Sequence, residues 1–242
     1  MTRSLMQNND SLPAEKHKHI PARNLIADSA LGVSDGLITN LSFLTGFSGA
    51  ISSIALLRVA GIAAMLAGSV SMFFGGLLAT RSHIDLYHAD SKRESYEIAH
   101  EPEEERRELT DFYLEKGLTE AEANMVVSRV TSNKKKWLED MLIHELHIHE
   151  SELGNPYKKG IIFSFSFLVG AFVPLLPYLL LSLKDYPFLA SLSTSLLFLF
   201  VVGAWKGRIV GRSIWRSGIE MLSVGVAGSV ILYIIGLALV FA

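Results

Sequence analysis

Long apolar stretches and one long polar stretch alternate along the chain, and this pattern predicts where helices cross a membrane. A spanning α-helix needs about 20 consecutive, mostly apolar residues. Half of all residues are hydrophobic and the mean hydropathy is +0.34, which is too apolar for an ordinary soluble domain. We therefore expect an all-α membrane protein with five transmembrane helices. The five windows that meet the required length are 28–50, 59–80, 160–182, 187–205 and 218–242.

The distribution of basic residues predicts the orientation of these spans. Lys and Arg in short loops stay on the cytoplasmic side. In the loops expected on the far side, only Arg58 and Lys184 are basic, whereas the N-terminal segment, 81–159 and 206–216 hold all the other bases. We expect a cytoplasmic N-terminus and a C-terminus on the opposite side. The N-terminal segment lacks an apolar signal core, so we expect the first span to act as its own insertion signal.

Residues 81–159 interrupt the apolar pattern and predict a cytoplasmic helical module inserted between transmembrane helices 2 and 3. They hold 18 of the 24 acidic residues but only 12 of the 22 basic ones, so the module is acidic. The expected organisation is a cytoplasmic N-terminal segment at 1–27, transmembrane helices 1 and 2 at 28–80, the module at 81–159 and transmembrane helices 3 to 5 at 160–242.

Local signals predict the helix boundaries inside the module. Pro102 is expected to end a helix that continues from the second span and to begin the next one, because proline is tolerated in a first helical turn. Thr119 with Glu122 matches a capping box for a further helix. Ser132 or Asn133 is expected to cap the last helix, which runs to about residue 147.

Asp35 stands out in the first span, because a carboxylate surrounded by hydrocarbon is costly and usually functional. Asp28 lies seven residues earlier and therefore on the same helical face. Met72 in the second span adds a thioether, and carboxylate with thioether suits Fe²⁺ or Mn²⁺ better than Ca²⁺. The alternatives are that Asp28 only caps a helix at the interface and that Met72 only fills space.

A second set of candidate ligands lies in the module. Two pairs of glutamates at three-residue spacing, each pair on one helical face, are followed by two candidates on the last module helix. These residues are Glu94, Glu97, Glu105, Glu108, Met141 and Glu145. Four converging carboxylates would bind a hard cation, but such a series also forms ordinary solvated helix faces, and the sequence leaves both interpretations open. Three histidines at the end of the module are also candidates, namely His144, His147 and His149. They could supply nitrogen ligands, sense pH or be ordinary surface residues, and the sequence leaves these interpretations open.

Several other classes of protein are excluded or disfavoured. The absence of cysteine excludes disulfides, thiolate metal sites and cysteine nucleophiles. The chain has no phosphate-binding glycine loop, no dinucleotide-binding fingerprint and no HExxH motif. Asp28 and Asp35 share one helix at about 10 Å along its axis, whereas an intramembrane aspartyl hydrolase needs two acids that face each other. We therefore expect no enzymatic activity, no prosthetic group and no nucleic-acid partner.

The chain resembles the vacuolar iron transporter (VIT) family. The resemblance extends from about Asp28 to Glu220 and includes the insertion between the second and third spans. It rests on four motifs in the same order, namely GVSDGL, SMFFGGLLATRS, DFYLEKGLT and VGAFVPLLPY.

This resemblance implies a five-span homodimer that moves Fe²⁺, and often Mn²⁺, out of the cytosol in exchange for protons. It implies a pathway between the subunits that is lined by Asp28, Asp35 and Met72. It also implies that the module binds metal through Glu94, Glu97, Glu105, Glu108, Met141 and Glu145. Two positions differ from the family pattern. Ala64 replaces a glutamate of plant-type members, which leaves proton coupling and metal choice open, and Leu142 replaces a second methionine.

We therefore expect a proton-coupled exporter of Fe²⁺ or Mn²⁺ in the membrane. One alternative is a membrane-anchored sensor or buffer that binds iron or manganese without transport, and another is a transporter of a different divalent cation. The expected location is the cell membrane of a prokaryote or the vacuolar membrane of a eukaryote.

Overall fold

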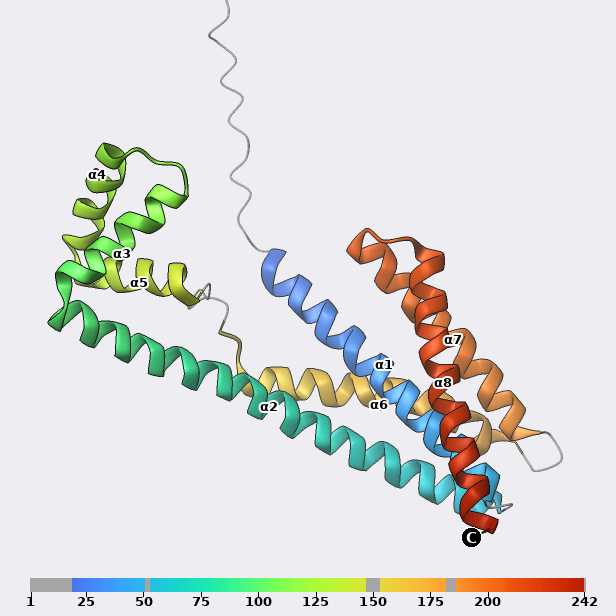
Figure 1. The fold of residues 1–242 in the computed structure, drawn as a ribbon. Helices are drawn as coiled ribbons and strands as arrows, with labels where there is room; N and C mark the ends of the chain where they lie inside the picture. Colours follow the sequence, from blue (N-terminus) through green and yellow to red (C-terminus); the bar gives the residue numbers. More distant parts are fainter. Residues whose placement is uncertain (1–18, 51–52, 147–152, 182–185, 242) are drawn as a thin grey trace, which may run out of the picture. The chain divides into compact units, whose positions relative to one another are not determined.

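The computed structural model describes residues 19–50, 53–146, 153–181 and 186–241, and this part of the chain is helical without any strand. The described residues form eight helices, and Figure 1 labels them in chain order. They are α1 (His19–Ala50), α2 (Ile54–His100), α3 (Pro102–Glu115), α4 (Glu120–Thr131), α5 (Lys134–Leu146), α6 (Pro156–Leu180), α7 (Pro187–Val210) and α8 (Ile214–Phe241).

The chain divides into two compact units. The first comprises α1, α2 up to Ser69, α6 from Ile162, and the helices α7 and α8. The second comprises the rest of α2, the three short helices α3, α4 and α5, and the start of α6 up to Ile161.

Four of the described helices are long and apolar enough to cross a membrane, namely α2, α6, α7 and α8. This confirms the predicted class of all-α membrane protein. The first helix, α1, is not among the four although it has 32 residues, because serine, threonine, asparagine and aspartate recur along it. Several of these polar side chains are buried inside the first unit rather than presented outward, including Ser34, Asn40, Ser42 and Thr45.

In the first unit, α1 lies beside α7 and α8, and glycines let it approach α6 closely. A Cβ atom at Gly32 would lie 2.7 Å from Cβ of Ser166, and one at Gly36 would overlap the carbonyl oxygen of Phe167. The side-chain amide of Asn40, 1% exposed, donates a 2.6 Å hydrogen bond to the carbonyl oxygen of Ala171. Backbone contact and a buried hydrogen bond therefore fix α1 against α6.

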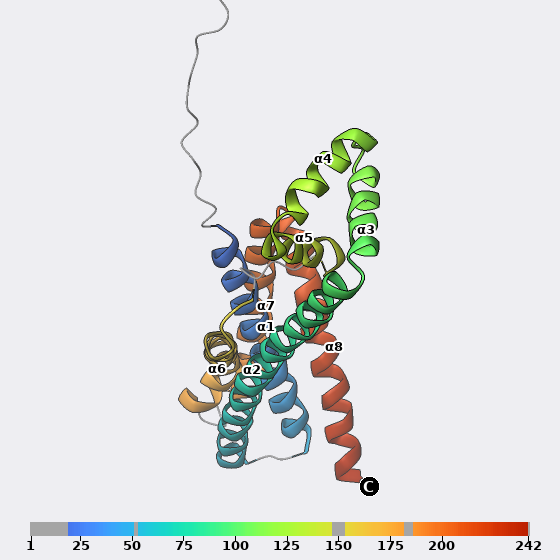
Figure 2. The ribbon, with the colours of Figure 1, turned by 90° about the vertical axis from the view of Figure 1, so that its left-hand side faces the viewer.

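In the second unit, the helix boundaries follow the local signals in the sequence. Helix α2 ends at His100 and Pro102 begins α3, as predicted. Thr119 and Glu122 form the predicted capping box at the start of α4. Asn133 rather than Ser132 caps α5, because its Oδ1 accepts hydrogen bonds from the backbone nitrogens of residues 135 and 136 at 3.0 and 3.2 Å. Figure 2 shows α3, α4 and α5 following one another around this unit.

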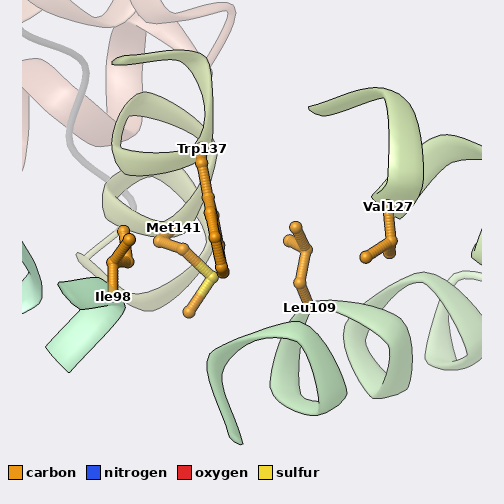
Figure 3. Close-up of a cluster of buried hydrophobic side chains, with 5 residues drawn as sticks. All are labelled: Ile98, Leu109, Val127, Trp137 and Met141. Carbon is orange, nitrogen blue, oxygen red and sulfur yellow. The ribbon is translucent and has the colours of Figure 1, made fainter. Parts of the chain in front are cut away.

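A small hydrophobic core holds α3, α4 and α5 to the end of α2. The buried members are Ile98, Leu109, Val127, Trp137 and Met141. Figure 3 shows Met141 beside Trp137 and Ile98, with Leu109 and Val127 on the other side of the indole ring. This core positions two acidic segments, the end of α2 and the start of α3, next to each other.

Candidate functional site

Asp35 lies on α1 between Gly32 and Gly36, the two glycines that contact α6. The Asp35 side chain lies on another face of α1, toward α7 and α8. It is half-buried and lines a cavity of about 560 Å³ formed by α1, α7 and α8. Nine of the twelve lining residues are apolar, and Lys206 is the other charged one. Thr39 Oγ1 donates to Asp35 Oδ1 at 3.5 Å. Within the described part of the chain, Asp35 forms no ion pair with a basic side chain.

The other two residues expected on the pathway have less defined surroundings. Asp28 lies two helical turns before Asp35 on α1, is half-buried and does not line the 560 Å³ cavity. Met72 lies on α2 in the second unit and is half-buried. The pairing of Asp35 with Met72 as ligands of one ion therefore stays a prediction.

The two glutamate pairs of the module do converge. Glu94 and Glu97 from the end of α2 and Glu105 and Glu108 from α3 line one cavity of about 360 Å³. Arg93, Glu101 and Glu104 complete its lining. Sequence reasoning missed Glu101 and Glu104, although both stand in the acidic run around the proline that starts α3. The cavity thus presents six carboxylates and one guanidinium.

Burial makes this cavity electrostatically unusual. Glu94 is 2% exposed and Glu105 is 6% exposed, whereas Glu97 and Glu108 retain access to solvent. Arg93 pairs with Glu97 at 3.8 Å. Six carboxylates in a shared cavity repel one another, and a divalent cation relieves this repulsion while supplying ligand bonds to oxygen.

The carboxylates that line the cavity are suitable ligands for a cation, but their side chains are not arranged around a common point. In the portion of the chain that the structure describes, no three His, Asp or Glu side chains surround a single point closely enough to hold an ion. Glu97 and Glu108 are the accessible members of the predicted set, so their side chains have more rotational freedom than those of Glu94 and Glu105.

Met141 and its neighbours on α5 form a separate environment. Met141 is 5% exposed in the module core and also lines a cavity of about 160 Å³ together with Glu108 and His144. Leu142 is buried at 3% exposure. The side chain of Glu145, and the residues His147 and His149, lie outside the described residues.

The chain matches a family model and known relatives over most of its length. The family model of the VIT family matches residues 26–237. Vacuolar iron transporter 1 of Arabidopsis thaliana is 34% identical over 212 residues, which cover 88% of this chain and 85% of that protein. Vacuolar iron transporter 2 of Oryza sativa subsp. japonica is 34% identical over 218 residues, with coverage of 90% and 89%. The vacuolar iron transporter of Toxoplasma gondii is 30% identical over 209 residues, with coverage of 82% and 69%. The chain therefore belongs to the VIT family.

Proposed function

We propose that this chain is a metal transporter that carries Fe²⁺ or Mn²⁺ out of the cytosol in exchange for protons. The observation that carries the proposal is the position of Asp35, whose carboxylate lines a largely apolar cavity among α1, α7 and α8. A carboxylate in such surroundings is costly unless a cation visits it. The names of the relatives described above support iron as the cargo.

The acidic module supplies the capture step of this mechanism. Glu94, Glu97, Glu105 and Glu108 attract divalent ions from the cytosol and concentrate them near the membrane. Asp35, with Asp28 and Met72 as further ligands, then passes the ion across the bilayer. Protons compete with the metal for the same carboxylate oxygens, so a more acidic far side favours release. Neither an enzymatic step nor a prosthetic group is needed.

The transport topology requires α1 to be a fifth crossing helix. Its 32 residues extend about 48 Å, which exceeds the roughly 30 Å hydrocarbon core. Burial of Ser34, Asn40 and Ser42 supports this assignment, because the lipid does not meet these polar groups. With five crossings the two termini lie on opposite sides of the membrane, and the distribution of Lys and Arg favours a cytoplasmic N-terminus and module. The membrane is the cell membrane if the source is prokaryotic and the vacuolar membrane if it is eukaryotic.

The resemblance in sequence also supports a homodimer with the pathway between its two subunits. Cross-linking in native membranes, followed by mass measurement in detergent, tests this directly. A purely monomeric population at the concentrations used for transport would contradict it.

Metal flux into proteoliposomes with an imposed pH gradient tests the proposed function. We expect the unmodified protein to accumulate Fe²⁺ and to move protons in the opposite direction, and Asp35→Ala to abolish both. Asp35→Asn is the isosteric companion variant, and Asp111→Asn, an exposed module position, is the control that should retain flux. Undiminished flux in correctly folded Asp35→Ala refutes the role of Asp35.

The same assay separates the alternatives. A metal sensor or buffer would bind Fe²⁺ with no flux in the unmodified protein. A transporter of another cation would show flux that Mn²⁺, Co²⁺, Zn²⁺ or Ca²⁺ drives better than Fe²⁺ does. Flux without proton movement would remove the antiport step but leave the metal transporter.

A further inference from the structure

We propose that the buried hydroxyl groups of Ser42, Ser195 and Ser229 form an internal water-binding site between α1, α7 and α8, and that protons rather than metal ions pass through it. The proposal rests on the function proposed above, because it assigns a route to the protons of the antiport. None of the three serines belongs to the ligands proposed for the metal.

The three hydroxyl groups are buried without a partner. Ser42, Ser195 and Ser229 are each at most 4% exposed, and within the described part of the chain their Oγ atoms form no hydrogen bond. A serine inside a helix often donates to the carbonyl oxygen one turn earlier, as Ser34 does to Ala30 at 2.7 Å. A buried hydroxyl without such a bond is costly unless water satisfies it.

The packing of α7 against α8 brings two of these serines to the same level. The two helices run antiparallel, and every fourth residue of α7 closely approaches every fourth residue of α8. The approaching pairs are Gly207 with Ser217, Gly203 with Met221, and Leu199 with Gly225. One further step of four residues along each helix places Ser195 opposite Ser229.

Ser42 brings a third hydroxyl group to this level from α1. A Cβ atom at Gly228, the residue before Ser229, would lie 2.8 Å from Oγ of Ser42. The hydroxyl of Ser42 therefore lies directly against α8, where glycine leaves the backbone uncovered. The three serines thus lie at one level of three helices that pack on one another (Figure 1). A buried water typically forms about three hydrogen bonds to otherwise unsatisfied polar groups, which matches this set.

The chemistry of the site favours water over a metal ion. Along these helices the nearest carboxylates are Asp35, seven residues before Ser42, and Glu220, nine residues before Ser229, and α7 has none. Three neutral hydroxyls do not offset the cost of removing a divalent cation from water within a membrane. A hydroxyl both donates and accepts hydrogen bonds, so hydroxyls and water together can pass a proton.

The serine site follows the Asp35 cavity along the same helices. Ser42 lies about 10 Å beyond Asp35 on the same face of α1. Between them is Ile38, which packs in one apolar cluster with Leu199 and Met221. An apolar layer one side chain thick blocks a hydrated metal ion, whereas a proton needs only transient water there. The proton route thus differs from the pathway between subunits proposed for the metal.

A crystal structure of the full-length protein at a resolution that shows ordered water tests the site. We expect one water within hydrogen-bond distance of all three Oγ atoms, and its loss in Ser195→Ala. Ser191→Ala is the matched control, because the buried hydroxyl of Ser191 lies one turn earlier on α7 and donates to the carbonyl oxygen of Pro174 at 2.6 Å. Alanine is a good helix former, so both variants should fold. Hydroxyls that bond to carbonyls or to one another, with no water among them, overturn the proposal.

Two flux measurements in proteoliposomes separate proton passage from metal passage. Net Fe²⁺ uptake driven by a pH gradient requires protons to move, whereas exchange of labelled for unlabelled Fe²⁺ at equal pH does not. We expect the double variant Ser195→Ala and Ser229→Ala to lose net uptake several-fold and to lose much less of the exchange. Ser191→Ala should lose neither. Equal losses of uptake and exchange in the double variant overturn the proton route.

Failure of the proposed function gives a different result. An unmodified protein with neither Fe²⁺ uptake nor exchange refutes the transporter, and the proton route with it. An unmodified protein that exchanges protons for Fe²⁺, together with a double variant that does so at the same rate, refutes only this inference.

Discussion

Arg58, near the start of α2, holds the end of α6 through the backbone of Tyr178. Its Nε donates to the carbonyl oxygen of Tyr178 at 2.6 Å, and its Nη2 donates to that of Leu181 at 3.1 Å. Carbonyls in the last turn of a helix have no partner within the helix. Arg58 is one of only two bases expected on the non-cytoplasmic side, and these contacts give its charge a structural role.

We expect Arg58→Met to lower the unfolding temperature of the detergent-solubilised protein. Each hydrogen bond from a charged donor contributes about 1.5–3 kcal/mol, and this variant loses two of them. Arg212→Met is the control, because the Arg212–Glu220 pair is exposed at 3.6 Å and such pairs contribute about 0–1 kcal/mol. Equal unfolding temperatures for the two variants would contradict the role given to Arg58.

A second prediction concerns the close contact of α1 with α6. Gly36→Ala places a Cβ atom against the carbonyl oxygen of Phe167 and 2.9 Å from the backbone nitrogen of Ala171. Backbone atoms cannot yield as a flexible side chain does, so we expect a loss of about 1–3 kcal/mol or more in stability and displacement of the neighbouring Asp35. The unfolding temperature in detergent and the rate of Fe²⁺ flux should both fall.

Gly75→Ala is the matched control for this substitution. Gly75 is also inside a helix, but a Cβ atom there meets nothing within 4 Å. Replacing a helical glycine by alanine stabilises by about 1 kcal/mol when space allows. If Gly75→Ala lost as much stability as Gly36→Ala, the contact between α1 and α6 would not be the cause of the destabilisation in Gly36→Ala.

The sequence predicted local features of the fold better than contacts between distant helices. Local signals predicted the helix boundaries of the module, because Pro102 and the Thr119–Glu122 capping box act within a few residues of themselves. By contrast, nothing in the sequence predicted the close approach of Gly32 and Gly36 to α6. Their contact with α6 joins segments more than 100 residues apart, which helical periodicity does not encode.

For the candidate sites too, spacing along the chain predicted local features but not how separate helices pack together. Spacing placed the two glutamate pairs on helix faces, but their convergence depends on how α2 and α3 pack around a shared core. Met141 was predicted only as a ligand, whereas it is also a core residue beside Trp137. A side chain with both roles cannot be recognised from its identity and spacing alone.

The buried carboxylates of the module lead to a third prediction. We expect Glu94→Gln to raise the unfolding temperature of the metal-free protein, because it removes one negative charge from a cavity with six carboxylates. The same variant should lose most of the stabilisation by added Mn²⁺, which in the unmodified protein is about 2.7 kcal/mol at 100 times the Kd. Glu103→Gln, an exposed residue outside the cavity lining, should show neither effect.

A fourth prediction concerns alkaline pH. Partial burial and the adjacent Asp140 carboxylate raise the pKa of Tyr113 from 10.0 to about 12. Between these pH values the unfolded chain loses the phenol proton while the folded protein keeps it, so Tyr113 contributes stability below pH 10 that is lost as pH rises toward 12. The unfolding temperature measured from pH 8 to 11.5 should fall less steeply in Tyr113→Phe. Parallel curves for both proteins would contradict this.

The last prediction concerns the start of α4. Glu122 Oε2 accepts hydrogen bonds from Thr119 N at 2.9 Å and from Thr119 Oγ1 at 2.7 Å, and these bonds lower the pKa of Glu122 below its ordinary 4.5. The stabilisation is therefore present above pH 4.5 and is lost as pH falls through the lowered value. Loss of a threonine cap costs about 1 kcal/mol, a factor of about five in local opening. Hydrogen exchange of the full-length protein should show this acceleration in the first turn of α4 for Thr119→Ala, and not for Ser132→Ala, whose hydroxyl instead donates to the carbonyl oxygen of Arg129.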